Sequence, residues 1–290
     1  MTMEKSPKIR GNMENSTQRK TGVKTWQNRS FKDTVNALSL KMGDSGYSEV
    51  HNTWHSEQSV VPFTRIYIVQ EGSAWLSNGK QTFWMEPYRV YIIPAGAVCS
   101  YHCDSFMRKL YFHVNVYRPD RYDLLWGAEK IGCLPVEKSL VDNLVYHYRS
   151  EGYLSAMILQ ASLMELLGKH LEQTRTDTGV PCYSEDVTRA IDYIHRNLSA
   201  RLHIDELAAS LFVSRTYLTE RFRKETGISL GKYIDEQLML EAQRRLYRSN
   251  ANIGIISRDL GFSDQFYFAR RFKQLCGLSP LQYRRKSRQT

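Results

Sequence analysis

Apolar residues recur three or four positions apart over the last third of the chain, from about Leu202 to Arg285, and this spacing predicts helices. The pattern occurs twice, because residues 205–229 and 255–279 align with each other. The matching pairs are Leu207/Ile256, Leu211/Leu260, Ser214/Ser263, Tyr217/Tyr267, Phe222/Phe272, Gly227/Gly277, Ser229/Ser279 and Tyr233/Tyr283. The first three pairs lie about 49 residues apart and the others about 50, so one additional residue follows Ser263 in the second copy.

Each copy is predicted to be a helix-turn-helix unit. A short helix leads through a tight turn to Ser214 or Ser263, which we expect to cap a second helix that ends at glycine. The inner faces of the two second helices comprise Leu218, Phe222, Phe268 and Phe272, and their open faces comprise Arg215, Thr216, Thr219, Glu220 and Arg223 in the first copy and Gln265, Phe266, Ala269, Arg270 and Lys273 in the second. Open faces rich in hydrogen-bond donors suit the major groove of DNA.

A further helical stretch, from Leu230 to about Ser249, joins the two copies. At 1.5 Å per residue, roughly 20 residues span about 30 Å, which is close to the roughly 34 Å turn of B-DNA. Two recognition helices held in this way could enter successive major grooves on one face of a duplex. A helical bundle used for protein contact is the alternative, but it does not explain two copies at this spacing.

The end of the second copy resembles the AraC/XylS family of bacterial transcription regulators. The family pattern G-F-x-(D/S)-x-x-(Y/H)-F-x-R-x-F-K-x-x-x-G-x-(S/T)-P-x-x-Y-R is met by Gly261, Phe262, Asp264, Tyr267, Phe268, Arg270, Phe272, Lys273, Gly277, Ser279, Pro280, Tyr283 and Arg284. Two departures stand out: Phe212 occupies the turn where a glycine is usual, and Leu238 stands where the family commonly has an arginine.

The resemblance implies a role for individual residues of the two units. Base edges are expected to be contacted by Arg215, Thr216, Thr219, Glu220, Gln265, Phe266 and Arg270, and phosphates by Arg221, Lys224, Lys273, Arg284 and Arg285. Arg270 is the leading candidate for base readout, because arginine can bind guanine O6 and N7 together. The partners that the resemblance implies are double-stranded promoter DNA and RNA polymerase.

Between Phe31 and Val116 the pattern changes to short alternating runs rich in β-branched and aromatic residues, which favours a small antiparallel barrel or sandwich. We expect strands at Ser48–His51, Thr64–Val69, Gly72–Leu76, Lys80–Met85, Arg89–Ile93, Val98–His102 and Lys109–Val116, with a hairpin turn at Asn78-Gly79. This region is similar to the cupin-type sensor domain of many relatives, which implies a ligand pocket inside a barrel.

Aromatic residues are dense in this region and suit a pocket for a small amphipathic molecule, a sugar being one candidate, although core packing alone would also explain them. The predicted effector-binding residues are Arg65, Tyr67, Trp75, Tyr91 and His102. A metal-dependent cupin enzyme would need an H-x-H pair, and the sequence has none here. We therefore expect no metal, no cofactor and no catalytic residue.

After Tyr117, helices are predicted at Pro135–Ser150 and Leu154–Gln173. The wide Leu and Met face of the second helix needs a partner, and the resemblance implies a homodimer contact; packing onto the chain's own barrel is the alternative. Polar residues 174–183 with Gly and Pro then form a linker. Ser184 opens the first helix of the next domain, with acidic residues in its first turn.

Charge is distributed unevenly along the 290 residues, whose net charge is +10. Residues 184–290 and 1–32 are basic, whereas residues 33–183 are mildly acidic, and a basic end that carries a paired helix-turn-helix indicates nucleic acid. Five cysteines, an odd number, favour a reducing, cytoplasmic setting. The sequence has no membrane-spanning apolar run and no signal peptide pattern.

The sequence thus predicts an α+β protein with five segments. These are a disordered basic tail (1–30), a cupin-like antiparallel β-barrel (31–134), a helical dimerisation segment (135–173), a linker (174–183) and an all-α domain with two helix-turn-helix units (184–290). The predicted function is a DNA-binding transcription regulator responsive to a small molecule, with activation favoured and carbohydrate-related genes as candidate targets. The alternatives are a DNA-repair methyltransferase carrying the same DNA-binding domain, a metal-dependent cupin enzyme and a constitutive DNA binder.

Overall fold

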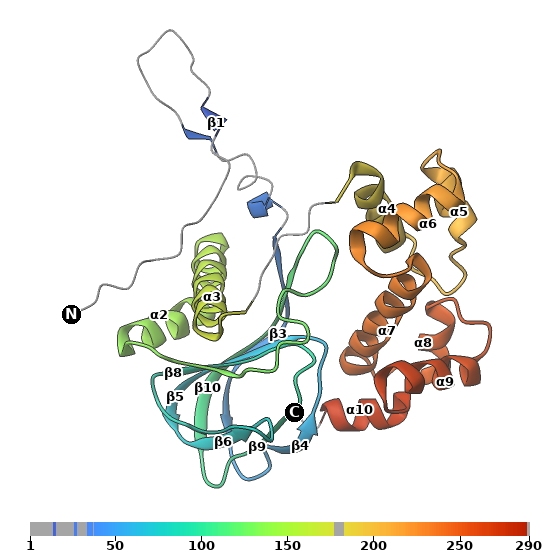
Figure 1. Cartoon of the computed structure of the whole chain (residues 1–290). Helices are drawn as coiled ribbons and strands as arrows, with labels where there is room; N and C mark the ends of the chain where they lie inside the picture. The colour runs from blue at the N-terminus through green and yellow to red at the C-terminus, as the bar shows by residue number, and fades with distance from the viewer. Residues whose placement is uncertain (1–13, 16–25, 28–33, 37, 177–182, 289–290) are drawn as a thin grey trace.

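The computed structural model describes residues 14–15, 26–27, 34–36, 38–176 and 183–288. They form a β-rich N-terminal part, two helices that cover it and a helical C-terminal part beside it (Figure 1), which confirms the predicted α+β class. The disordered tail predicted for residues 1–30 lies outside the described residues, except for the paired strands β1 (Glu14–Asn15) and β2 (Trp26–Gln27). Residues 177–182 of the predicted linker also lie outside them.

The strands between residues 39 and 135 form two antiparallel sheets. The first has the order β11 (Gly132–Pro135), β8 (Arg89–Ile93), β5 (Thr64–Gly72), β10 (Met107–Tyr117) and β3 (Ser39–Val50), and the second has the order β4 (His55–Ser59), β9 (Cys99–His102), β6 (Ala74–Ser77) and β7 (Thr82–Met85). Apolar residues of both sheets share one buried cluster, so the sheets pack face to face. They are not joined into one closed sheet, and the expected barrel is a two-sheet sandwich.

The chain passes from the first sheet to the second at Gly72. Its φ is +75°, and a Cβ atom there would lie 2.2 Å from the carbonyl oxygen of Phe106, so only glycine fits. The predicted hairpin at Asn78-Gly79 is confirmed between β6 and β7, where the Asn78 N–H donates to the Gln81 carbonyl over 3.1 Å. These two turns place β6 and β7 opposite β5.

Strand β5 is buried on both faces. Ile66 and Ile68 pack towards the covering helices, whereas Tyr67 and Val69 pack between the sheets. Side chains alternate along a strand, so Arg65 lies on the same side as Tyr67. A charged side chain therefore stands in the interior of the sandwich, where Arg65 is 0% exposed.

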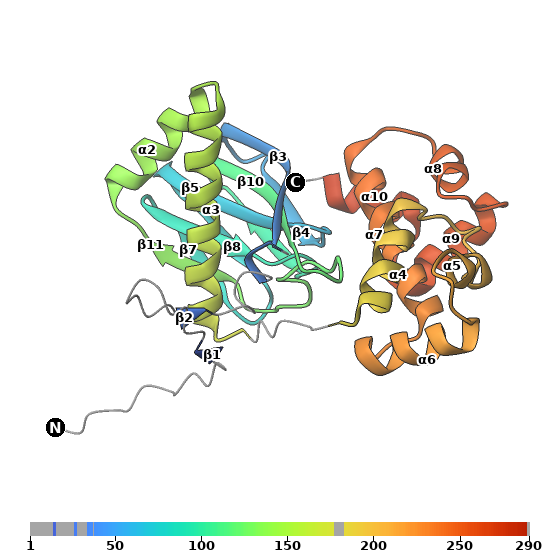
Figure 2. The ribbon, with the colours of Figure 1, turned by 90° about the horizontal axis from the view of Figure 1, so that it is seen from above.

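Helices α2 (Lys138–Arg149) and α3 (Tyr153–Thr174) confirm the two helices predicted after the sheets. Figure 2 shows α3 lying across the first sheet. Leu163, Leu166 and Leu167 of α3 are buried in the cluster that covers this sheet. That side of the predicted dimer helix is thus used within the chain, as in the alternative interpretation, and the opposite side is exposed.

His170 of α3 is buried at the edge of this cluster. A Cβ atom on Gly132 of β11 would lie 2.3 Å from its Nδ1, and neither ring nitrogen has a hydrogen-bond partner among the described residues. Burial of the ring lowers the pKa of His170 to about 4.

Replacing this side chain, in His170→Leu, is expected to weaken the pH dependence of stability. The unfolded chain protonates His170 near its ordinary pKa of about 6.5, whereas the folded chain does so only near 4, so folding stability is lost as the pH falls through this window. Between pH 6.5 and pH 5 the histidine should lower the free energy of unfolding by about 2 kcal/mol. Urea unfolding at both pH values measures this difference; an equal loss in the variant would contradict it.

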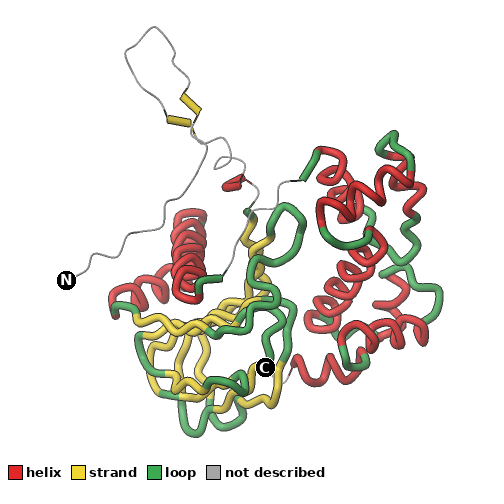
Figure 3. The backbone as a smooth tube through the Cα atoms, viewed as in Figure 1, coloured by secondary structure: helices red, strands yellow, loops and turns green. Residues whose placement is uncertain are grey.

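The C-terminal part contains only helices among its described residues (Figure 3). They are α4 (Glu185–Arg196), α5 (Ile204–Ser210), α6 (Arg215–Thr226), α7 (Leu230–Arg248), α8 (Ile253–Asp259), α9 (Gln265–Cys276) and α10 (Pro280–Arg288). The expected helix that opens at Ser184 is α4, with Glu185 and Asp186 in its first turn. The expected connecting helix is α7. One buried cluster runs from α4 to α10, so both helix-turn-helix units share a core with α7.

Candidate nucleic-acid interface and ligand pocket

The two helix-turn-helix units are α5–α6 and α8–α9. In the first unit the expected cap is confirmed, because the Tyr217 N–H donates to Ser214 Oγ over 3.2 Å. In the second unit the expectation for Ser263 is wrong: Asp264 is the cap, accepting from the N–H groups of Phe266 and Tyr267 over 3.1 and 2.8 Å. The additional residue of the second copy therefore supplies an acceptor at the positive end of a helix.

The turns of the two units differ as the sequence suggests. Phe212 has a φ of +59° and a side chain that is 92% exposed, so it adopts the left-handed conformation without steric conflict from neighbours. Gly261 has a φ of +83°, and a Cβ there would lie 2.0 Å from Ser199 Oγ. The second turn needs glycine for both conformation and space, whereas the first carries only backbone strain.

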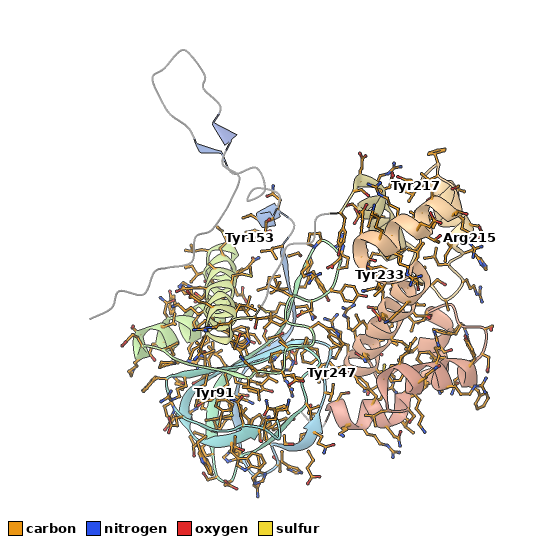
Figure 4. All side chains as sticks on the ribbon, viewed as in Figure 1. Tyr91, Tyr153, Arg215, Tyr217, Tyr233 and Tyr247 are labelled. Atoms are coloured by element: carbon orange, nitrogen blue, oxygen red, sulfur yellow. The ribbon has the colours of Figure 1, made fainter. Side chains whose placement is uncertain are left out.

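The inner faces of α6 and α9 are buried as predicted, since Leu218, Phe222, Phe268 and Phe272 are all 0% exposed. Of the residues predicted to contact bases, all are exposed except Thr219, which is half-buried. Thr219 Oγ1 donates to the Arg215 carbonyl over 2.9 Å, and Arg215 Nη1 pairs with Asp205 over 2.9 Å. Figure 4 shows Arg215 on the outer side of α6. The geometry leaves Thr216, Glu220, Gln265, Phe266 and Arg270 on open surface.

The residues predicted to contact phosphates have different surroundings. Lys224, Lys273 and Arg285 are exposed, and Arg221 is exposed but pairs with Glu225 one turn later. Arg284 is half-buried, and its Nη2 donates to the Ala251 carbonyl over 2.6 Å. The guanidinium of Arg284 thus fastens α10 to the segment before α8, a role within the fold that the sequence pattern did not indicate.

A pair of substitutions on α9 separates base readout from phosphate contact. Arg270→Ala is expected to cost about 1 to 3 kcal/mol on the selected DNA site and to relax sequence preference at one position. Lys273→Ala should leave that preference unchanged and lower the slope of log affinity against log salt by about 1. Mobility-shift titrations on specific and random DNA at several salt concentrations give both quantities. Equal losses of Arg270→Ala on both DNAs would make Arg270 a phosphate contact.

A cavity of about 190 Å³ opens between the sandwich and the C-terminal part. Its wall comprises Asp44, Ser48, Val50, Trp54, Tyr67, Lys109, Tyr111, His113 and Tyr247. All but Tyr247 come from the N-terminal part, and Tyr247 comes from α7 (Figure 4). The helix that joins the two helix-turn-helix units therefore forms part of the pocket.

Lys109 lies at the inner end of this pocket and is 2% exposed. Its Nζ lies 3.5 Å from the centroid of the Trp54 ring and 4.0 Å from that of Tyr67, so two aromatic faces enclose the ammonium group. Burial lowers the pKa of Lys109 well below its ordinary value. His113, beside it, stacks on Phe63 at 4.6 Å and makes a hydrogen bond of 3.3 Å with the Tyr247 hydroxyl.

The predicted effector residues lie in different places. Tyr67 lines the pocket, and Arg65 is buried behind it, donating to Ser59 Oγ over 3.2 Å. Tyr91 is buried and its hydroxyl donates to the Trp84 carbonyl, which holds β7 against β8. Trp75 of β6 pairs with His102 of β9. In both strands the residues next to these two, Leu76 and Tyr101, point to the other side and enter the buried cluster. The structure does not bring Trp75, Tyr91 and His102 to the pocket wall.

Sequence reasoning missed Lys109 and Tyr247. The alternation of β10, in which Lys109, Tyr111 and His113 share one side, was a usable signal for the first. Nothing local could indicate Tyr247, since the pocket joins β10 to α7 across more than a hundred residues.

A second set of contacts holds the loop after β10 against the C-terminal part. The hydroxyl of Tyr233 in α7 donates to the Asp120 carbonyl over 2.8 Å, and Arg121 Nη2 lies 3.1 Å from Asp192 Oδ1 of α4. Tyr183 also donates to Asp120, over 3.0 Å. Helix α7 is thus contacted by the N-terminal part at Tyr233 and at Tyr247, on either side of its middle.

None of the described helices is long and apolar enough to cross a membrane. The profile of a helix-turn-helix domain family matches residues 207–286. The HTH-type transcriptional activator AarP of Providencia stuartii is 34% identical over 101 residues, which are 35% of this chain and 75% of AarP. The raffinose operon transcriptional regulatory protein RafR of Pediococcus pentosaceus is 25% identical over 276 residues, 90% of this chain and 97% of RafR.

Two other curated regulators align over only 38% and 45% of their own lengths. Among solved structures, the C-terminal domain of AraT, a response regulator from Geobacillus stearothermophilus, is 34% identical with a TM-score of 0.34, and the alignment covers 35% of this chain and 85% of that domain. The duplicated helix-turn-helix and its exposed second helices are consistent with the similarity to AarP, of which this chain covers 75%. The chain belongs to the AraC-type family of helix-turn-helix transcription regulators.

Proposed function

We propose that this regulator binds two successive major grooves through α6 and α9. The observation that carries this proposal is that both helices present open faces while their inner faces share one core with α7. At 1.5 Å per residue, the 19 residues of α7 span about 28 Å, a length comparable to one turn of DNA. A common core keeps the two helices at a fixed separation, which fixes the spacing of the bases they read.

A mobility-shift titration with the full chain tests this proposal. DNA is first selected from a random pool, and its affinity is then compared with that of shuffled DNA at one salt concentration. A sequence-specific regulator should prefer the selected DNA by roughly 10³-fold or more. Equal affinity for both would reduce the protein to a non-specific DNA binder.

The pocket between the sandwich and α7 is proposed as the effector site. A ligand there touches Tyr247, and α7 is the helix on which both recognition helices pack. Allostery requires a ligand that binds one state of the protein more tightly than another. A ligand in this pocket meets that requirement, because it contacts α7 only in the state in which α7 closes the pocket. The effector thereby changes the presentation of α6 and α9 without touching the DNA-contacting side chains.

The protein is further proposed to act as a homodimer through the exposed side of α3. Leu154, Met157, Ala161, Met164 and Gly168 are spaced alternately three and four residues apart, which is the spacing of a coiled-coil seam. Leu154 and Met157 are 71% and 67% exposed. This stripe, which we call the α3 seam, is directed away from the leucines that pack onto the sheet, except that Met164 is half-buried against the same cluster. The small side chains of Ala161 and Gly168 permit close approach of a second copy.

Promoter activation through RNA polymerase, in the cytoplasm, is the proposed cellular role. The name of AarP as a transcriptional activator supports activation, and the name of RafR as a raffinose operon regulator supports carbohydrate-related target genes. The boundaries proposed for the functional segments are those predicted from the sequence: sensor 31–134, dimerisation segment 135–173, linker 174–183 and DNA-binding domain 184–290.

A further inference from the structure

Positive charge inside the sandwich has no acidic counterpart there. Lys109 and Arg65 are 2% and 0% exposed, and neither makes an ion pair with a carboxylate among the described residues. The rings of Trp54 and Tyr67 face the Lys109 amine, and the Cys103 thiol lies near enough to act on its charge. Aromatic faces offset only part of the cost of removing an ammonium group from water. An amine buried in this way either loses its proton or gains an anionic partner from outside the fold.

The pocket geometry places such a partner. Lys109 lies on the pocket wall and Arg65 behind it, so the charge of Arg65, and that of Lys109 once it is protonated, points into the cavity. Asp44 stands on the same wall with a side chain that is 56% exposed, and its Oδ2 lies 3.9 Å from His113 Nδ1. A ligand therefore meets positive charge at the inner end and a carboxylate nearer to solvent, an arrangement that disfavours a second negative charge.

The volume of the cavity and the other side chains on its wall restrict the class of ligand further. A cavity of about 190 Å³ suits a molecule of about the size of one sugar ring. Ser48, Tyr111 and Tyr247 bring hydroxyl groups to the wall, and Asp44 brings an acceptor.

We propose that the effector pocket binds a small hydroxylated monocarboxylate, such as a sugar acid, whose carboxylate pairs with Lys109 while its hydroxyl groups meet Asp44, Ser48 and Tyr247. This rests on the proposed role of the pocket as effector site. A neutral sugar supplies no charge that could pair with protonated Lys109, and a phosphate dianion would bring a second charge towards Asp44.

Thermal shift and titration calorimetry on the full chain, without DNA, test the ligand class. The probes are D-glucuronate, D-galacturonate and D-gluconate, with D-glucose, D-galactose and inorganic phosphate for comparison. At least one acid should bind and raise the melting temperature, whereas the neutral sugars and phosphate should not. Lys109→Met keeps the length of the side chain between the two rings and should weaken acid binding by roughly 10- to 100-fold, the range for losing a charged hydrogen bond.

Lys80→Met is the matched control, since Lys80 is exposed on the β6–β7 hairpin and pairs with Glu129 at the surface; acid binding should be unchanged in it. Proton uptake by the unmodified protein is a further test, and it does not depend on whether a variant folds. Because burial lowers the pKa of Lys109, binding of the acid should take up protons, which calorimetry in buffers of different ionisation enthalpy detects.

Three results would overturn the ligand class: binding of a neutral sugar as tight as that of its acid, acid binding that survives Lys109→Met, or binding of none of the three acids. A mobility-shift arm with the same probes separates this inference from the proposed function. If an acid binds but DNA affinity does not change, the ligand class stands and the effector role of the pocket fails. If a neutral sugar alone changes DNA affinity, regulation stands and the ligand class fails.

Discussion

Phe272→Ala is expected to lower the free energy of unfolding by about 3 to 5 kcal/mol, because it removes a large ring from a close-packed core. Phe272 is 0% exposed on the inner face of α9. Its ring centroid lies 5.8 Å from that of Phe268 and 5.5 Å from that of Tyr283 on α10. The cavity would loosen α9 from α7 and α10, so DNA affinity should fall together with stability. Urea unfolding followed by circular dichroism measures the first quantity and mobility shift the second.

Phe266→Ala is the matched control on the same helix. Phe266 is 72% exposed on the open face of α9. Its removal should change the free energy of unfolding by no more than about 0.5 kcal/mol, as for other surface positions. DNA affinity should still fall, since this face is proposed to enter the groove. Similar stability losses in the two variants would mean that α9 does not pack in the described orientation.

Met157→Glu is expected to abolish dimerisation and to weaken binding to a two-site operator by roughly 10²- to 10⁴-fold, the range in which linked binding exceeds single-site binding. The substitution places a charge in the middle of an apolar contact between two copies of the α3 seam, which is costly. The monomer should stay folded, because Met157 is 67% exposed. Analytical ultracentrifugation and mobility shift on one-site and two-site DNA report the two effects.

Ala156→Glu provides the comparison, since it adds the same charge at an exposed position of α3 that is outside the α3 seam. It should remain dimeric. A substitution at Leu163 would be a poor test, because this residue is 0% exposed and its loss would disturb the packing onto the sheet. A Met157→Glu protein that sediments as a dimer would exclude the α3 seam as the interface.

The helices of the C-terminal part were predictable because their information is local. Ser214, Gly227 and Gly277 occupy cap positions, and the apolar spacing fixes the buried face of each helix. The strands were harder to place. Strand β4 has the sequence HSEQS and an irregular pairing with β9, and the middle of β3 contains Gly43, Asp44 and Gly46, so neither shows the alternation of a half-buried strand.

The errors at the pocket arose because the sequence does not show which face of a strand is buried. In β6 and β9 the sequence offers large side chains on both sides, as in Leu76 beside Trp75 and Tyr101 beside His102, and only the packing of the two sheets decides which side is buried. The missed Lys109 depends on the same choice of buried face. The contribution of Tyr247 depends on the docking of α7 against the sandwich, a contact between distant parts of the chain that no local pattern encodes.

The central claim is that one chain reads two successive major grooves with α6 and α9. Methylation protection of guanine N7 by the full-length protein on selected DNA tests it most directly, because N7 lies in the major groove. We expect each protomer to protect two clusters centred about 10 base pairs apart on one face of the duplex. Arg270→Ala should remove protection from only the cluster under α9. A single cluster per protomer, or two clusters on opposite faces of the DNA, would contradict this account.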